Sequence, residues 1–187
     1  MTTPYDSAFY AEHVNGSLAA ARAVSSIVCM QGLPSSVIDL GCGVGTWLKA
    51  FEEQGSTRLV GVDGPWVDRE AFLCATGTLY AKDLREPVEG LGIFDLAMSL
   101  ETAEHLPETS ADIFVDSLVG LAPVILFSAA FKGQTGADHI NEQPEEYWIA
   151  KFNSRGYEMR DNIRPIIKDM SDIPWWYRHN IIMFYRR

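Results

Sequence analysis

The stretch that decides the fold is Asp39-Leu-Gly41-Cys-Gly43-Val-Gly45-Thr-Trp47. The apolar run Ser36–Leu40 leads into it, and Thr46–Gln54 follows with apolar side chains at helical spacing. Glycines at such a junction let the backbone turn sharply and let a ligand lie against the peptide groups, because no Cβ stands in the way. The pattern therefore predicts a buried strand, a tight ligand-binding loop and a helix in succession.

An acid at the end of the next predicted strand, Arg58–Asp63, extends this pattern. Asp63 follows Gly43 by 20 residues, and a carboxylate there can accept hydrogen bonds from both hydroxyls of a ribose. The dinucleotide fingerprint requires Gly or Ala where this chain has Thr46. Asp39 also places a carboxylate two residues before the first glycine, which suits a cationic ligand such as S-adenosylmethionine better than a pyrophosphate.

Strands and helices alternate along the rest of the chain. Further strands are predicted at Thr78–Asp83, Ile93–Leu100 and Val124–Ala130, and helices at Ser7–Met30, Ala111–Leu121 and Glu145–Ser154. Two β-rich stretches, Tyr157–Ile167 and Asn180–Arg187, close the chain with no obvious helix between them. The alternation predicts an α/β fold with a mostly parallel sheet, helices on both faces and an antiparallel final strand.

Composition limits the classes of function. The chain has 187 residues and a formal net charge of −10, which predicts one domain over 1–187, with a helical cap at 1–32 and a core at 36–187. The acidic balance disfavours a broad nucleic-acid surface. Three cysteines without CxxC spacing, no signal-peptide pattern and no apolar run long enough for a bilayer predict a cytoplasmic protein without a membrane segment.

These features resemble the class I S-adenosylmethionine-dependent methyltransferases over nearly the whole chain. The glycine stretch is similar to that family's first motif, Val62-Asp63-Gly64 to its ribose-binding acid, and Phe94–Leu100 to its fourth-strand motif. The resemblance implies a Rossmann-like seven-stranded sheet and S-adenosyl-L-methionine as cofactor. The cofactor-binding residues it implies are Asp39, Gly41, Cys42, Gly43, Thr46, Trp47, Asp63, Gly64, Lys82, Asp83, Leu84, Ser99 and Leu100.

A cluster of acids and a histidine, Glu101-Thr-Ala-Glu104-His105, follows the fourth predicted strand, at the sheet edge where open α/β folds bind ligands. On a helical turn Glu101 and His105 would share a face. The Glu-x-x-Glu-His spacing is similar to the metal motif of small-RNA terminal 2′-O-methyltransferases and ubiquinone-pathway O-methyltransferases. In the RNA group a downstream histidine completes the site, and His139 could do so here.

Two chemical roles for this cluster stay open. Glu101, Glu104, His105 and His139 could hold a divalent cation, Mg or Mn, that lowers the pKa of a hydroxyl. Alternatively His105, His139 or Glu101 acts in catalysis without metal, with an imidazole as the base. Family members without metal carry a similar run. In the structural alternative, Glu101 and Glu104 are solvated or cap neighbouring backbone groups, and His105 packs beneath the cofactor or acts as a base.

Three further segments are candidates for substrate contact. Pro174-Trp-Trp-Tyr-Arg178 could stack on a sugar or line an apolar pocket, or else pack in the core or a dimer interface. The polar residues Asn141, Glu142 and Gln143 could bind a polar substrate, or Asn141 could cap the helix that follows. Tyr10 or His13, on the first helix, could touch a ligand.

The sequence therefore predicts an O-methyltransferase for a small hydroxylated molecule, a sugar or a secondary metabolite, acting as a monomer or homodimer. Nitrogen is the second choice of acceptor atom. One alternative is an RNA ribose 2′-O-methyltransferase with a metal site, against which the net charge of −10 stands. Another is a catalytically idle cofactor-binding partner subunit, and a dehydrogenase is a weaker third.

Overall fold

The computed structural model describes residues 7–187, and the side chains from residue 16 onward. Helix α1 (Ser7–Cys29) is a single helix, and the predictions for Tyr10 and His13 lie outside the described side chains. None of the helices in this described part combines the length and the apolar character needed to cross a bilayer.

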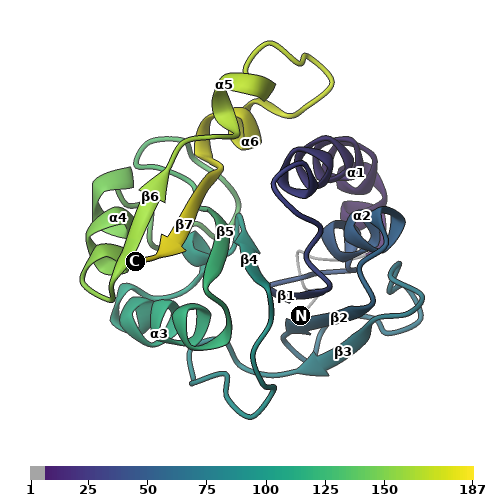
Figure 1. The fold of residues 1–187 in the computed structure, drawn as a ribbon, viewed down its shortest axis with the longest axis horizontal. Helices are drawn as coiled ribbons and strands as arrows, with labels where there is room; N and C mark the ends of the chain where they lie inside the picture. Colours follow the sequence, from purple (N-terminus) through teal and green to yellow (C-terminus); the bar gives the residue numbers. More distant parts are fainter. Residues whose placement is uncertain (1–6) are drawn as a thin grey trace.

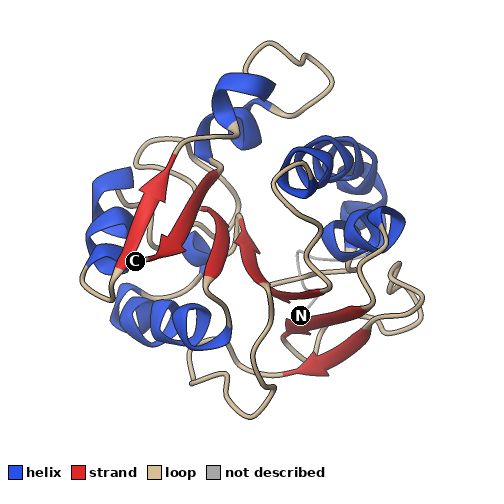
Figure 2. Ribbon diagram, in the orientation of Figure 1, coloured by secondary structure: helices blue, strands red, loops and turns tan. Residues whose placement is uncertain are grey.

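Seven strands form one sheet in the order β3-β2-β1-β4-β5-β7-β6 (Figures 1 and 2). Strands β1 to β5 are parallel, whereas β7 runs antiparallel to both of its neighbours, β5 and β6. The prediction of a mostly parallel, seven-stranded, Rossmann-like sheet with an antiparallel final strand is confirmed. The strands are β1 (Ser36–Leu40), β2 (Arg58–Asp63), β3 (Thr78–Ala81), β4 (Leu96–Leu100), β5 (Val124–Ser128), β6 (Tyr157–Arg160) and β7 (Ile182–Arg186).

Helices cover both faces of the sheet, and each face has its own apolar core. On one face α1 and α2 (Thr46–Gln54) pack with Val37 of β1. On the other, α3 (Ala111–Leu121) and α4 (Glu145–Asn153) pack with the next residue of β1, Ile38. Because successive side chains of a strand point to opposite faces, the central strands need apolar side chains on both faces, as β1 has at Val37, Ile38 and Leu40.

The connection between the last two strands differs from the sequence expectation. Strand β6 is short, and two helices, α5 (Arg164–Ile167) and α6 (Trp175–Asn180), follow it before β7 begins. The prediction that no helix separates the last two strands was therefore wrong. Both helices start at a proline, Pro165 in the first turn of α5 and Pro174 at the N-cap of α6, and both are too short to show an apolar period. This helical lobe, residues 161–181, projects beyond the sheet at the top of Figure 1.

Candidate active site

A cavity of about 890 Å³ lies along the carboxyl ends of the parallel strands. The chain runs outward from β1 to β3 on one side of the sheet and from β4 to β5 on the other, so the cavity sits where the strand order reverses. We call the part lined by the loops after β1, β2 and β3 the β1–β3 half. The part lined by the loops after β4 and β5 and by α6 is the β4–β5 half. Ligand pockets usually measure about 300–1,000 Å³, so this cavity has room for two ligands.

The glycine loop between β1 and α2 needs its glycines for both conformation and space. Gly41 has φ of 86° and Gly45 has φ of 78°, in the left-handed region that other residues avoid. A Cβ on Gly41 would stand 2.2 Å from Oγ1 of Thr102, and one on Gly45 would stand 2.5 Å from the ring of Phe72. The loop therefore lies tightly against its neighbours and presents its peptide groups to the cavity.

Asp63, at the end of β2, is fixed by two backbone donors. Its Oδ2 accepts a hydrogen bond from the N–H of Gly43 at 2.7 Å, and its Oδ1 accepts one from the N–H of Gly64 at 2.6 Å. Burial raises the pKa of Asp63, and these two hydrogen bonds oppose the rise. The ring of Trp66, which sequence reasoning missed, lies against Gly64 and lines the same half with 60% of its surface exposed.

Most of the predicted cofactor residues line the cavity, whereas Asp39 and Ser99 are buried and do not. Burial, and secondly the charge of Asp63, hold the pKa of Asp39 well above its usual value. Among the described residues, neither Oδ1 of Asp39 nor Oγ of Ser99 has a hydrogen-bond partner. The predicted residues that line the cavity are Gly41, Cys42, Gly43, Thr46, Trp47, Asp63, Gly64, Lys82, Asp83, Leu84 and Leu100.

Asp83 is paired with a neighbour that the sequence analysis did not single out. Arg85 contacts it with Nη2 2.5 Å from Oδ2, and this ion pair lowers the pKa of the exposed Asp83 carboxyl to about 2. Both side chains line the β1–β3 half. The positive charge of Arg85 is therefore already matched within that half.

The acid–histidine cluster does not form the helical turn that its spacing predicts. Strand β4 ends at Leu100, Glu101 has φ of 52°, and a short 3-10 turn begins only at Ala103. The prediction that Glu101 and His105 share a helical face was therefore wrong, because Glu101 itself has a left-handed backbone and lies before the turn begins.

Glu104 is the most deeply buried member of the cluster, with none of its surface exposed. Within the described part of the chain, neither carboxylate oxygen has a hydrogen-bond partner of normal geometry. Burial raises the pKa of Glu104 well above its usual value, and the nearby Glu101 carboxylate raises it further. A buried carboxylate without partners is costly, so this position suits a ligand that supplies positive charge or a donor.

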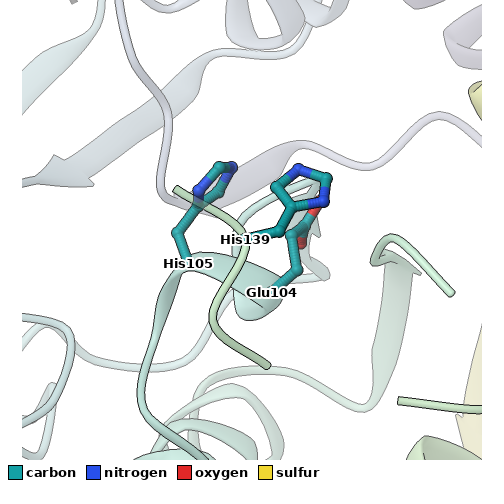
Figure 3. Close-up of side chains that lie close together, drawn as sticks. All are labelled: Glu104, His105 and His139. Carbon is teal, nitrogen blue, oxygen red and sulfur yellow. The ribbon is translucent and has the colours of Figure 1, made fainter. Parts of the chain in front are cut away.

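His105 and His139 stand beside Glu104, although 33 residues separate them in the chain (Figure 3). One ligand atom from each of the three side chains lies within 4.8 Å of the other two, and the imidazole centroids are 4.9 Å apart. Of the four predicted metal ligands, the structure groups Glu104, His105 and His139 in this way, and Glu101 lies outside the group.

Each imidazole is oriented by an oxygen near its Nδ1. Nδ1 of His139 lies 2.9 Å from Oε1 of Glu142, and Nδ1 of His105 lies 3.2 Å from the carbonyl oxygen of Asp138. When Nδ1 of His139 donates to Glu142, its Nε2 carries the lone pair that can bind a proton or a cation. Burial lowers the pKa of His105, and the nearby His139 lowers it further.

Glu101 belongs to a separate network that ties the cluster to α6. Nδ2 of Asn180 donates to both Glu101 oxygens, at 3.2 and 3.3 Å. The side-chain amides of Asn180 and Gln134 also exchange two hydrogen bonds of 2.9 Å. Burial raises the pKa of Glu101, and its polar contacts with Ser128 and Asn180 oppose the rise. No sequence motif marks Gln134 or Asn180, because their pairing joins residues 46 positions apart.

The two other predicted contact segments have different outcomes. Trp175, Trp176 and Tyr177 line the cavity, although they lie on a helix rather than in a loop. Asn141 does not cap α4, whose N-cap is Pro144, and the prediction of a cap was wrong. Instead the N–H of Asn141 donates to the carbonyl oxygen of Glu104 at 3.0 Å, which ties the loop after β5 to the 3-10 turn.

Comparisons with known proteins identify the family. Residues 10–114, more than half of the chain, match a family model described as a methyltransferase domain. No curated protein matches the sequence.

Several solved structures share the fold at low sequence identity. An amino pentose methyltransferase from Micromonospora echinaspora, CalS10, is 14% identical, with a TM-score of 0.69 and full coverage of both chains. Magnesium protoporphyrin IX methyltransferase from Synechocystis PCC 6803, with SAM bound, is 19% identical over 92% of this chain and 80% of that one, with a TM-score of 0.66. The methyltransferase domain of bacterial CtHen1-C is 19% identical over 90% of this chain and 98% of its own, with a TM-score of 0.63.

The fold and the family model agree with the motifs around Gly41–Gly45 and Asp63. Similar structures hold SAM or SAH, the methyl donor and its demethylated product. The chain therefore belongs to the methyltransferase-domain family and is a class I S-adenosylmethionine-dependent methyltransferase.

Proposed function

We propose that this methyltransferase modifies a hydroxyl group of a small molecule bound in the β4–β5 half of the cavity. The observation that carries the proposal is the placement of Glu104, His105 and His139 in the same cavity as the glycine loop. Two of the similar structures are named for small-molecule acceptors, a magnesium porphyrin and an amino pentose, which supports an acceptor of that size.

The residues of the β1–β3 half fit the cofactor. Asp63 holds its carboxylate at the cavity wall on two backbone N–H groups, ready to accept hydrogen bonds from ribose hydroxyls. Trp47, on α2, and Leu100, the last residue of β4, also line the cavity, and the methionine part would lie beside them. The bound cofactor supplies an activated methyl group on a positively charged sulfur, and the buried carboxylate of Asp39 favours that charge.

The cluster around Glu104 also fits a divalent cation. Glu104, His105 and His139 offer one carboxylate and two imidazoles, a mixed oxygen and nitrogen set of the kind that Mn²⁺ and related ions accept. Glu142 and the Asp138 carbonyl orient the two rings from behind, as the outer partners of metal-binding histidines do. A divalent ion held there would lower the pKa of the acceptor hydroxyl.

A second candidate mechanism needs no metal and rests on the contact between Glu142 and His139. A carboxylate that accepts from Nδ1–H stabilises the imidazolium that forms when Nε2 takes a proton. In this mechanism His139 removes the proton of the acceptor hydroxyl while the cavity aligns its oxygen with the methyl group.

One experiment tests the function and separates the two mechanisms. Calorimetry with S-adenosylmethionine is expected to give binding, and binding of a nicotinamide dinucleotide alone would overturn the assignment. Mn²⁺ is then titrated into the wild-type chain and into Glu104→Gln, with Asp116→Asn, an exposed acid on α3, as the matched control. Metal binding that is lost only in Glu104→Gln, together with methyl transfer that stops on chelation, supports the metal site. Transfer that survives chelation but not His139→Ala supports the base.

A further inference from the structure

The β4–β5 half exposes large apolar side chains to the cavity. Trp175, on α6, keeps 45% of its surface exposed, and Ile140, on the loop after β5, keeps 64%. Both line the cavity together with Trp176, whose ring meets that of Trp175 edge to face at 6.2 Å. Covering apolar surface of this kind stabilises a complex. An indole face also favours a flat aromatic partner, because two aromatic rings attract each other beyond the area that they bury.

The charged side chains of the same half disfavour ligands that carry a negative charge. Its acids and histidines are Glu101, Glu104, Asp138, His105 and His139, and Tyr177 of α6 is its other titratable side chain. Among the described residues that line this half there is no Lys or Arg. A ligand phosphate or carboxylate would therefore find no Lys or Arg side chain to pair with among those described residues. If a divalent ion binds, the carboxylates of Glu101 and Glu104 offset its charge.

Hydrogen bonds hold the loop after β5 and helix α6 in place before any acceptor binds. The amide pair of Gln134 and Asn180 joins the loop that carries Ile140 to the helix that carries Trp175. Asn180 also donates to Glu101, so this one residue connects the loop after β5, helix α6 and the acid that follows β4. A binding site that is already ordered selects ligand shape strongly, because little ordering cost remains.

We propose that the methyl acceptor is an aromatic hydroxyl compound without negative charge. Its ring packs on Trp175 and Ile140, and its hydroxyl faces Glu104 and His139. This inference rests on the proposed function and adds the class of substrate to it. It also excludes RNA, because a polyanion needs the basic residues that this half lacks.

Binding of matched probes tests the proposal without requiring the natural acceptor. The chain is saturated with S-adenosylhomocysteine and titrated with 2-naphthol, with 6-hydroxy-2-naphthoate, which adds a negative charge, and with 2-decalol, which is saturated and not flat. We expect 2-naphthol to bind at least ~10-fold more tightly than the naphthoate and ~3–10-fold more tightly than the decalol. Equal or tighter binding of either matched probe overturns the proposal, as does displacement of 2-naphthol by a single-stranded RNA oligonucleotide.

Variants then locate the probe. Trp175→Ala is expected to weaken 2-naphthol binding by ~10-fold and Trp175→Phe by less. Ile166→Ala is the control, because Ile166 is 53% exposed on α5 and does not line the cavity. Equal binding to wild type and Trp175→Ala overturns the proposal. If S-adenosylhomocysteine itself does not bind, the proposed function fails. If it binds and the probes are not discriminated, only the acceptor class is wrong.

Discussion

The two halves of the cavity are built in different ways. The β1–β3 half uses backbone N–H groups and short acids from loops that directly follow their strands, as at Gly43 and Asp63. The β4–β5 half uses long side chains from three segments far apart in the chain, around Glu104, His139 and Trp175. On the function proposed above, the difference separates two tasks: local loops would hold the cofactor, while long-range contacts would assemble the reacting groups and the acceptor site.

The largest expected effect tests whether the β4–β5 half serves turnover alone. His139→Ala should lower kcat by about 10²–10⁴-fold, because the hydroxyl loses the group that accepts its proton or helps hold the cation. His105→Ala should act in the same direction. Calorimetry should show unchanged affinity for S-adenosylmethionine in both variants. A parallel loss of turnover and cofactor affinity would mean that the imidazoles are structural and that the two halves are not separate.

The converse variant lies in the β1–β3 half. Asp63→Ala should weaken cofactor binding by about 100-fold or more, because each hydrogen bond to a charged acceptor contributes about 1.5–3 kcal/mol and the ribose forms two. Asp68→Ala is the matched control, since Asp68 lies in the same loop but does not line the cavity. Calorimetric affinities that are equal for the two variants would end the ribose assignment.

A smaller effect concerns the stability of the protein without cofactor. The folded state holds the pKa of Asp39 above its unfolded value, so the unfolded chain releases the proton first and stability falls as pH rises through the folded pKa. Asp39→Asn should therefore stabilise the empty protein by about 1–3 kcal/mol at pH 8, or roughly 2–4 °C in Tm for each kcal/mol.

Thermal unfolding between pH 4 and pH 8 measures this difference. The difference in Tm between Asp39→Asn and the wild type should shrink towards pH 4, because the raised pKa keeps the folded carboxyl protonated there and the unfolded carboxyl is increasingly protonated too. A difference that stays constant with pH would show that ionisation of Asp39 is not its cause.

The smallest expected effect tests how tightly the parts of the β4–β5 half are joined. Gln134→Ala removes one partner of the amide pair with Asn180, and a hydrogen bond of this kind contributes about 1 kcal/mol. We expect about a fivefold rise in KM for the acceptor, an unchanged kcat and unchanged cofactor affinity. Steady-state kinetics with 2-naphthol measure the first two quantities, and a rise in the cofactor Kd would contradict the assignment to this half.

The same difference explains how far the sequence could be interpreted. Strand, glycine loop, helix and terminal acid lie within 28 residues of one another, from Ser36 to Asp63, so their local patterns predicted the sheet and the place of Asp63 correctly. His139 could be placed opposite Glu104 because both follow parallel strands, and the carboxyl ends of such strands share one edge.

The features of the fold and the site that the sequence did not predict depend on contacts between residues far apart in the chain. Glu101 takes a left-handed conformation directly after β4 ends, and a helical spacing rule could not foresee it. Helices α5 and α6 are too short for periodicity, and their prolines were the only signal. Asn180 became recognisable only when the fold brought it to Glu101 across 79 residues.

The antiparallel pairing of the last two strands has a consequence for how this enzyme can change. Arg160 at the end of β6 pairs with Met183 of β7, so the lobe at 161–181 leaves the sheet and returns to the same place, as an enlarged hairpin loop would. Its length can therefore vary, or the segment can be grafted from a relative, without altering the order of the strands, as long as the buried positions Ile163, Ile167 and Ile181 stay apolar. Provided that Asn180 is kept, we expect new acceptors to be gained by exchanging this one segment.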